Sequence, residues 1–240
     1  MNIDPSQHDG FQSELAYWDR EFSLQGDYPD AILNRSVPER MEREFPGYLS
    51  KYFEEIRQAA EPGLARVLDV GSGPLSMLNW GSLCGLFELT AADPLAFEYE
   101  RLLHEHGLKP LCRMVTVFGE KLGSQFAQSS FDLIWIHNAL DHSQSPLVVL
   151  EQCTSLLRPG GYLVFQGWNH EATAEGWIGL HRHNIWLSES LELYSESRLV
   201  DAEPFTVSLC EGLPIALVES MAPTVRVKQW IRMVWRRGLY

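Results

Sequence analysis

The stretch Arg66-Val67-Leu68-Asp69-Val70-Gly71-Ser72-Gly73-Pro74-Leu75-Ser76 decides the fold of this chain. It begins with a short run of apolar, strand-favouring residues that is interrupted by one acid. A pair of glycines follows at once, and Pro74 then suits the first turn of a helix. Strand, glycine turn and helix in this order form a nucleotide-sized pocket at the carboxyl ends of the strands in a doubly wound sheet. The stretch predicts such a pocket around Gly71 and Gly73, where the missing Cβ atoms let a ligand approach the backbone.

The acid that follows the glycine turn supports this pocket. The second predicted strand ends at Asp93, which lies 24 positions after Asp69. An acid at this distance, at the tip of the neighbouring strand, is placed to accept hydrogen bonds from ribose hydroxyls. Asp93 is also a candidate helix N-cap, and the two roles are compatible. The third glycine of a dinucleotide-binding fingerprint is replaced by Ser76, which disfavours a nicotinamide cofactor.

The composition excludes some classes of function. The chain has 240 residues, 45% of them hydrophobic, and a formal net charge of −13. This acidic balance does not favour nucleic acid as a partner. The four cysteines are scattered without a CxxC pair, which is typical of reduced thiols in an intracellular protein. The N-terminus lacks a basic start and an apolar core, and no apolar run reaches a membrane-spanning length. We therefore expect a cytoplasmic protein.

Strands and helices alternate through the middle of the chain. We predict strands near 66–70, 87–92, 112–117, 131–137 and 161–167, and helices near 75–81, 94–106, 121–127 and 145–157. Ser145 and Pro146 suit the N-cap and the first turn of the last of these helices. This alternation predicts an α/β fold: a Rossmann-like, doubly wound, mainly parallel sheet with helices on both faces. Segments 198–210 and 213–220 are predicted to form an antiparallel hairpin that closes the sheet.

The N-terminal residues 1–60 are predicted to be a helical cap, with Leu15, Trp18 and Phe22 at helical spacing. We interpret this cap chiefly as a packing layer beside the sheet. The alternative is a lid over the pocket, in which Tyr17, Trp18 and Tyr28 contact the substrate.

Polar and aromatic residues follow the third and fourth strands. Phe118 could lie against an adenine ring and Glu120 could accept from an exocyclic amine, or they are a core aromatic and a surface acid. The loop after the fourth strand carries His137, Asn138, Asp141 and His142. In this architecture reacting groups lie at the carboxyl ends of the strands.

Taken together, these stretches resemble class I S-adenosylmethionine-dependent methyltransferases. The resemblance rests on VLDVGSGP (67–74), the strand-end Asp93, FDLIWIHNALDH (131–142) and LLRPGGYLVF (156–165), in order and spacing. It covers residues 60 to 168, within a predicted methyltransferase domain of residues 61–220. The segment LDHSQSP (140–146) is similar to the small-molecule branch of the family. No NPPY-type signature is present, which disfavours methylation of DNA or glutamine.

The resemblance implies S-adenosylmethionine as the cofactor and assigns residues to it. Asp69, Gly71 and Gly73 would line the methionine end, Asp93 would bind the ribose, and His137 and Asn138 would border the sulfonium. The complete set of predicted cofactor-binding residues is Asp69, Gly71, Ser72, Gly73, Asp93, Pro94, Phe118, Gly119, Glu120, His137 and Asn138.

The acceptor side has its own candidates. His142, oriented by Asp141, is the predicted general base for a hydroxyl acceptor. Residues 168–190 form an insertion rich in histidine, tryptophan and glycine, and its predicted acceptor-binding residues are Trp168, His170, His181, Arg182 and His183. His181 and His183, together with His170, Asp141 or His142, also contain potential ligands for a divalent metal. Their spacing fits no strong metal-binding motif, so we favour acceptor binding and predict no metal ligands.

The C-terminal residues 221–240 form a basic tail in which Val227, Trp230, Ile231 and Val234 would give an apolar stripe on a helix. Such a helix could lie peripherally on the inner face of a membrane. The alternatives are a docking helix against the acidic body and a homodimer contact.

The function predicted from the sequence is O-methylation of a small polar or glycan-type acceptor, with a phenolic acceptor as a variant. The alternatives are N- or C-methylation of a small metabolite, a nicotinamide-dependent oxidoreductase and a non-catalytic cofactor-binding scaffold.

Overall fold

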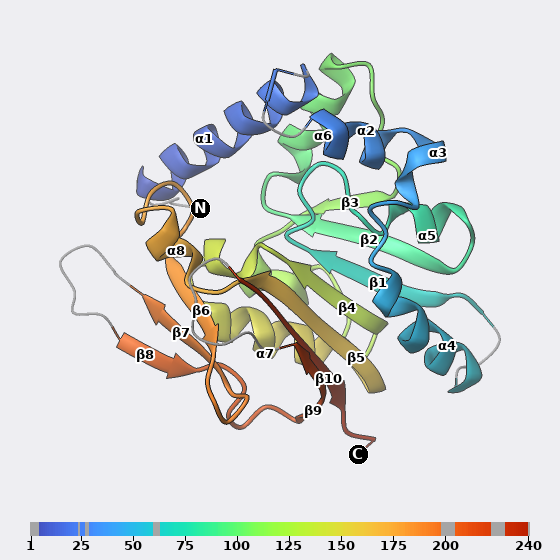
Figure 1. The fold of residues 1–240 in the computed structure, drawn as a ribbon. Coiled ribbons are helices and arrows are strands. Elements are labelled where there is room, and N and C mark those ends of the chain that lie inside the picture. Colours follow the sequence, from blue (N-terminus) through green and yellow to red (C-terminus); the bar gives the residue numbers. More distant parts are fainter. Residues whose placement is uncertain are drawn as a thin grey trace.

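The computed structural model describes residues 5–23, 25–26, 29–59, 63–197, 205–221 and 229–239. They form a seven-stranded sheet, a smaller three-stranded sheet and surrounding helices (Figure 1). The helices are α1 (Pro5–Phe22), α2 (Pro29–Ser36), α3 (Pro38–Met41), η1 (Gly47–Leu49), α4 (Ser50–Ala59), α5 (Asn79–Leu83), α6 (Ala96–Glu105), η2 (Gly119–Ser124), η3 (Leu140–His142), α7 (Pro146–Leu156) and α8 (Glu171–Ala174). The strands are β1 (Ala65–Val70), β2 (Phe87–Asp93), β3 (Arg113–Thr116), β4 (Phe131–His137), β5 (Leu157–Trp168), β6 (His183–Leu187), β7 (Leu193–Ser197), β8 (Phe205–Ser208), β9 (Ile215–Met221) and β10 (Trp230–Arg237).

The large sheet has the strand order β3-β2-β1-β4-β5-β10-β9. Each neighbouring pair from β3 to β5 is parallel, whereas β10 is antiparallel to both β5 and β9. The α/β, Rossmann-like fold with an antiparallel closing pair is therefore confirmed. The strand order reverses between β1 and β4, and ligands bind at such a reversal in open α/β sheets.

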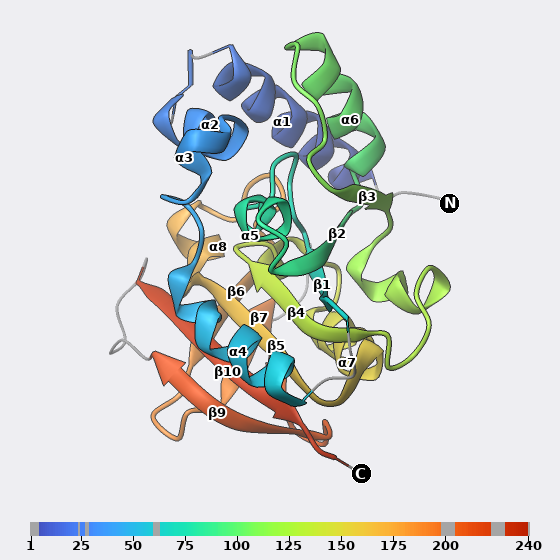
Figure 2. The same cartoon turned by 90° about the vertical axis from the view of Figure 1, so that its right-hand side faces the viewer.

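Both faces of the large sheet are covered, as the near-continuous apolar strands require. On β4, Leu133 and Trp135 point toward the α4 side, where Tyr52 and Phe53 pack. Ile134 and Ile136 point to the other side, toward the core that α7 covers. Figure 2 shows α4 in front of the sheet and α7 behind it. The parallel strands are thus fixed with their carboxyl ends at one edge.

The helix α7 begins as the sequence predicts. Ser145 is its N-cap, its hydroxyl accepts from the Val148 amide, and Pro146 occupies the first turn. The helix predicted near 75–81 begins later than expected, because α5 starts only at Asn79. The Ser76 hydroxyl accepts from the Leu78 amide, so a turn held by a side chain replaces the first helical turn. The helix predicted at 121–127 is instead the 3₁₀ segment η2.

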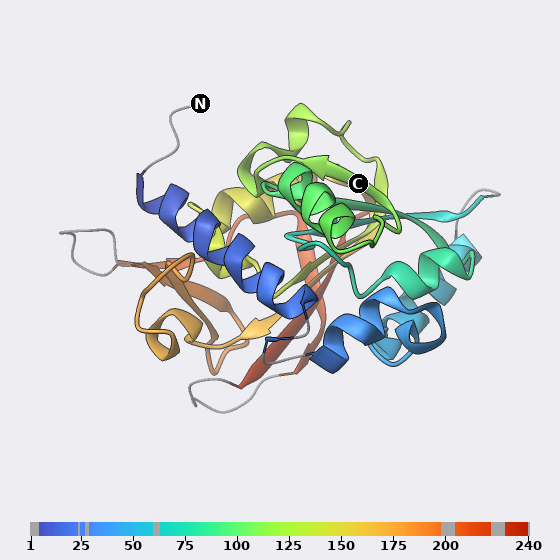
Figure 3. The same cartoon turned by 90° about the horizontal axis from the view of Figure 1, so that it is seen from above.

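The N-terminal helix α1 crosses above the carboxyl ends of the strands (Figure 3). Phe11 of α1 packs with Leu95, Tyr99 and Leu180, which lie after β2, on α6 and before β6. The helix is thereby fixed between the large sheet and the 168–190 insertion.

The C-terminal predictions need two corrections. Residues 230–237 are the strand β10 and not a helix, and residues 225–228 lie outside the described residues. Ile231, Met233 and Trp235 alternate along β10 and enter the core, a period-two pattern that coexists with the helical stripe. The predicted membrane contact required an amphipathic helix, and residues 230–237 do not form one. No helix within the described ranges is both long and apolar enough to cross a bilayer.

The partner of the closing hairpin also differs from the prediction. β9 pairs with β10, whereas β8, from the predicted 198–210 segment, pairs with β7. The insertion at 168–190 thus leads into a second sheet of order β6-β7-β8. Ile185, Leu187 and Leu193 of this sheet join the core on the α7 side.

Candidate active site

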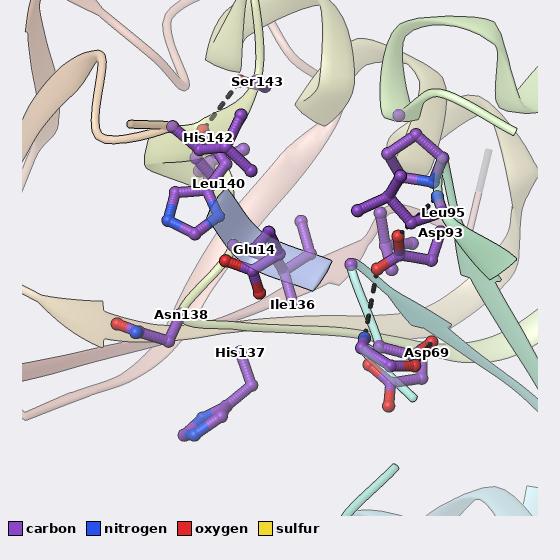
Figure 4. Close-up of a pocket in the computed structure, with 18 of the residues that line it drawn as sticks. Glu14, Asp69, Asp93, Leu95, Ile136, His137, Asn138, Leu140, His142 and Ser143 are labelled. Carbon is purple, nitrogen blue, oxygen red and sulfur yellow. Dashed lines mark hydrogen bonds between the residues drawn. The ribbon is translucent and has the colours of Figure 1, made fainter. Parts of the chain in front are cut away.

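A cavity of about 650 Å³ lies at the carboxyl ends of β1, β2 and β4, within the usual size range of ligand pockets. Its lining includes every predicted cofactor-binding residue and side chains of α1. Figure 4 shows Asp69 and Asp93 on one side of it, with His137, Asn138 and His142 on the other. The two strand-end acids therefore lie together, and Glu14 of α1 is drawn between the two groups in this view.

The glycine turn after β1 has the backbone that the sequence predicts. Gly71 and Gly73 have φ angles of +69° and +60°, in the left-handed region that favours glycine. A Cβ at Gly71 would lie 2.3 Å from the Cβ of Ala139, so the turn also packs closely against the loop after β4. The Gly73 amide donates to Asp93 Oδ2 at 3.1 Å, and the Leu95 amide donates to Oδ1 at 2.9 Å. Asp93 thus joins the glycine turn to the start of the α6 region.

The two acids are buried, and neither forms an ion pair with a basic side chain of the described residues. Burial raises the pKa of Asp69 to about 7, although the hydrogen bond from Ser76 to Asp69 Oδ2, 2.5 Å long, lowers it. Burial likewise raises the pKa of Asp93 to about 7, against its two backbone hydrogen bonds. A buried carboxylate is costly until it gains donors or a positive charge. The cavity is therefore suited to a ligand that carries hydrogen-bond donors and a positive charge.

His137 and Asn138 offer unpartnered polar atoms near the cavity. The His137 ring is stacked between Trp135 and Trp230, with centroids 4.9 and 5.1 Å away. Burial lowers the pKa of His137 to about 3, so the ring is neutral. His137 Nδ1 and Asn138 Oδ1 are buried and have no hydrogen-bond partner among the described residues. Asn138 also has a φ of +50°, so the chain turns sharply at the tip of β4.

Arg35 of α2 is a site residue that the sequence did not indicate. It lines the cavity, and its Nε has no hydrogen-bond partner within the described ranges. Burial lowers its pKa, while the charges of Glu44, Tyr17 and Asp69 raise it. No motif marked this arginine, because its segment carried only a helical pattern. Glu14, Tyr17 and Trp18 of α1 also line the cavity. Tyr17 and Trp18 belong to the lid alternative, and their contact with the substrate stays a prediction. Tyr28 lies outside the described residues.

A second polar group lies at the acceptor side. Asp141 Oδ2 is 2.8 Å from His181 Nδ1, and that nitrogen is 3.3 Å from His142 Nε2. Asp141 Oδ2 is 3.6 Å from His142 Nε2, so the acid orients His181 more directly than His142. Burial would raise the pKa of Asp141, but the charges of His142 and His181 hold it below its usual value. Burial lowers the pKa of His181, and Asp141 outweighs this and raises it.

The other predicted acceptor residues divide into two groups. Trp168 and His181 line the cavity, and Trp168 stacks on Trp230 with centroids 4.0 Å apart. His170, Arg182 and His183 do not line it. His170 stacks on Trp186. The buried His183 bonds the Ser143 carbonyl and the Ser195 hydroxyl, so it fixes the loop that carries His142.

Glu120 has a structural contact that the sequence did not indicate. Its Oε1 accepts from the Gln144 amide at 2.7 Å and from the Ser145 amide at 3.1 Å. Glu120 therefore ties the segment after β3 to the start of α7, beside His142.

Comparison with known proteins agrees with this arrangement. The methyltransferase domain family matches residues 68–165, which contain the glycine turn, Asp93 and the loop after β4. A ubiquinone biosynthesis O-methyltransferase of Xanthomonas axonopodis pv. citri is 35% identical over 129 residues, 50% of each chain. The enzyme of the same name from Histophilus somni is 28% identical over 185 residues, 74% of this chain and 68% of that one. The chain thus spans about half the length of the first of these relatives.

The solved structures agree on the fold. A S-adenosylmethionine-dependent methyltransferase from Clostridium acetobutylicum superimposes with a TM-score of 0.50 at 13% identity, covering 95% of this chain and 99% of that one. The domain match, the sheet order and the cavity at the strand ends lead to one conclusion: residues 68–165 form a methyltransferase domain, and the sheet that contains it has the fold of class I S-adenosylmethionine-dependent methyltransferases.

Proposed function

We propose that this protein methylates a hydroxyl oxygen of a small molecule, using S-adenosylmethionine. The observation that carries the proposal is the group of Asp141, His142 and His181. Its two histidines line the cavity, and Figure 4 shows His142 across from the two strand-end acids. A hydroxyl must lose its proton during methyl transfer, and this group can take it. The names of the relatives, which are O-methyltransferases of ubiquinone biosynthesis, also support transfer to oxygen.

The residues of the cofactor end fit S-adenosylmethionine. The bound cofactor supplies an activated methyl group on a sulfonium. We assign the ribose hydroxyls to Asp93, the methionine end to the glycine turn and Asp69, and the adenine to Phe118. The unpartnered atoms of His137 and Asn138 would face the region of the sulfonium. A protonated histidine at this place would repel the positively charged sulfonium. His137 is neutral and therefore does not.

The acceptor end combines apolar walls with one polar group. Trp168, Trp230 and Leu180 line the cavity beside His142 and His181. Indole rings suit a cyclic acceptor, such as a phenol or a sugar, because a phenol ring can stack on an aromatic face and the C–H groups of a sugar can pack against it. Holding the hydroxyl in line with the methyl group supplies much of the rate, and a positioned base typically adds ~10²–10⁴-fold. In this arrangement His142 is the base, and Asp141 holds His181 beside it.

A screen with methyl-labelled cofactor tests the proposal. The protein is incubated with phenols, catechols, sugars, amines and activated carbon acids, and the labelled products are mapped by mass spectrometry. We expect the label in a methyl ether. Label on nitrogen or carbon alone would transfer the assignment to one of the alternative acceptor classes.

Matched variants locate the chemistry. We expect His142→Gln to lower kcat by about 10²-fold or more while cofactor binding stays intact. His104→Gln, at an exposed position on α6, is the control and should match the wild type. A protein that binds the cofactor but labels no compound of any class would instead favour a scaffold.

A further inference from the structure

Three potential ligand atoms converge at the acceptor side of the cavity. They are Asp141 Oδ2, His142 Nε2 and His181 Nδ1, with separations of 2.8, 3.3 and 3.6 Å. They come from two segments far apart in the chain, η3 and the loop before β6. The arrangement is a small triangle of one carboxylate oxygen and two imidazole nitrogens.

Protons alone do not satisfy this triangle well. His181 Nδ1 has one in-plane direction, which holds either a hydrogen or a lone pair. If that hydrogen points to Asp141, His142 Nε2 can only share it. The distance from His142 Nε2 to Asp141 Oδ2, 3.6 Å, is too long for a hydrogen bond of its own.

We propose that Asp141, His142 and His181 bind one divalent transition-metal ion. Metal–ligand bonds to imidazole and carboxylate are about 2.0–2.2 Å, which puts adjacent ligand atoms about 2.8–3.1 Å apart in octahedral geometry and about 3.3–3.6 Å apart in tetrahedral geometry. The observed separations lie within these limits. Two imidazoles with one carboxylate favour Zn²⁺, Fe²⁺, Co²⁺ or Mn²⁺ over the all-oxygen ligand sets of Ca²⁺ and Mg²⁺.

The surrounding contacts hold the ligands in place. The Arg182 amide donates to the Asp141 carbonyl at 3.2 Å, and His183 Nε2 bonds the Ser143 carbonyl at 3.1 Å. These two contacts tie the segment of His142 to that of His181 on both sides of the triangle. Contacts of this kind, which orient the ligands, raise the affinity of metal sites.

The site also has a free side and a favourable charge. His142 and His181 line the cavity, so the remaining coordination positions face the space left for the acceptor. Glu171 and Glu175 line the same cavity, and their charges act on His181. An acidic environment of this kind favours a cation.

The binding of the ion does not depend on the proposed function. Its role in catalysis does, and that role is to help ionise the hydroxyl of the acceptor. A hydroxyl oxygen bound to the metal ionises more readily, and its proton leaves to water. The resulting oxyanion forms a bond to the methyl carbon, and the electrons of the broken C–S bond go to sulfur. In this mechanism His142 is a metal ligand and not the general base, because the metal lowers the pKa of the bound hydroxyl.

The first experiment measures binding without activity. Metal-free protein without an affinity tag is titrated with Co²⁺, read by visible absorption, and the Co²⁺ is then displaced with Zn²⁺. We expect one ion per chain. His181→Gln, His142→Gln and Asp141→Asn should each weaken binding by at least about tenfold. His104→Gln and Cys84→Ser, at exposed positions, are the controls and should bind as the wild type does.

The outcomes separate this proposal from the previous one. Binding of S-adenosylhomocysteine by each variant shows that it is folded. Absence of a stoichiometric ion in the wild type, or equal affinity in the three ligand variants, would overturn the metal site. If the ion binds but metal-free protein retains full O-methylation, the catalytic role of the ion is wrong. If the ion binds and no hydroxyl is methylated, the proposed function fails and the site remains.

Discussion

At the scale of single residues, the two strand-end acids should govern cofactor affinity. Asp69 and Asp93, with pKa values raised to about 7 by burial, are close to half neutral at pH 7 in the free protein. Ribose hydroxyls and a cofactor ammonium group favour the charged carboxylates. A ligand that prefers the deprotonated acid binds more weakly as the pH falls below the pKa of the free protein.

We therefore predict that the Kd of S-adenosylhomocysteine rises as the pH is lowered from about 8 to about 6, by up to tenfold per unit for each acid. Asp93→Asn should weaken binding at the higher pH and reduce the pH dependence. Calorimetric titration measures both effects, with Asp19→Asn, at an exposed position, as the control. A wild-type Kd that is constant over this range would contradict the assignment.

Arg35 carries a second prediction at this scale. Its Nε lacks a protein partner within the described ranges, and the guanidinium is electrostatically coupled to Asp69. A carboxylate of the cofactor would satisfy the free donor with a charge-assisted hydrogen bond, worth about 1.5–3 kcal/mol. Arg35→Gln should raise the Kd of S-adenosylhomocysteine by about tenfold or more. Arg43→Gln, at an exposed position, should leave it unchanged, and equal effects of the two changes would show that Arg35 does not bind the ligand.

At the scale of elements, β10 shows how one sequence fits two periodicities. A helical stripe and a strand alternation are both present in residues 230–237. The strand forms because β5 and β9 offer hydrogen-bonding edges on either side, and because Ile231, Met233 and Trp235 then enter the core. Basic residues of the same strand make contacts inside the fold: the Arg232 guanidinium lies 3.7 Å from the Tyr48 ring centroid, and Arg237 Nη1 donates to carbonyls at the end of α7.

The element-scale prediction concerns stability. Trp235 is 3% exposed, and Trp235→Ala should lower the free energy of unfolding by about 3–5 kcal/mol. Leu217 on β9 is 40% exposed, and Leu217→Ala should cost less than about 1 kcal/mol. Urea denaturation measures both variants. If the tail were a separate surface helix, the two substitutions would have similarly small effects.

At the scale of the whole molecule, the pocket is shared between the sheet and the helices that precede it. Phe11, Glu14, Tyr17 and Trp18 of α1 line the same cavity as the strand-end acids. Trp18 carbon atoms approach within 3.3 Å of the position that a Cβ would have on Gly73. The proposed cofactor site is therefore lined by elements from both sides of the predicted domain boundary at residue 60.

This arrangement predicts that ligand binding restrains α1. Amide hydrogen exchange in α1 should slow severalfold when S-adenosylhomocysteine is added, because local opening then competes with binding. The α7 helix, which lies on a face of the sheet, is the internal control and should change less. Unchanged exchange in α1 at saturating ligand would show that α1 only covers the protein and does not close over the cofactor.

The sequence by itself determined the parts of the protein that depend on neighbouring residues. The glycine turn, Asp93 and the loop after β4 each end a buried strand, and parallel strands bring their carboxyl ends to one edge. That geometric rule places Asp69, Asp93 and His137 around one pocket without further information. The N-cap of α7 likewise depends only on the neighbouring residues Ser145 and Pro146.

Only the tertiary structure decided what depends on contacts between distant segments. The strand at 230–237 needed open sheet edges, the approach of Arg35 to the cavity needed the packing of α2, and the meeting of His142 with His181 needed the path of the insertion. His181 and His183 are two residues apart and looked equivalent in the sequence. The pleat of β6 and the chain before it leave His183 bonded to Ser143 and His181 facing Asp141. Such choices depend on packing free energy summed over the whole fold, which a local pattern does not contain.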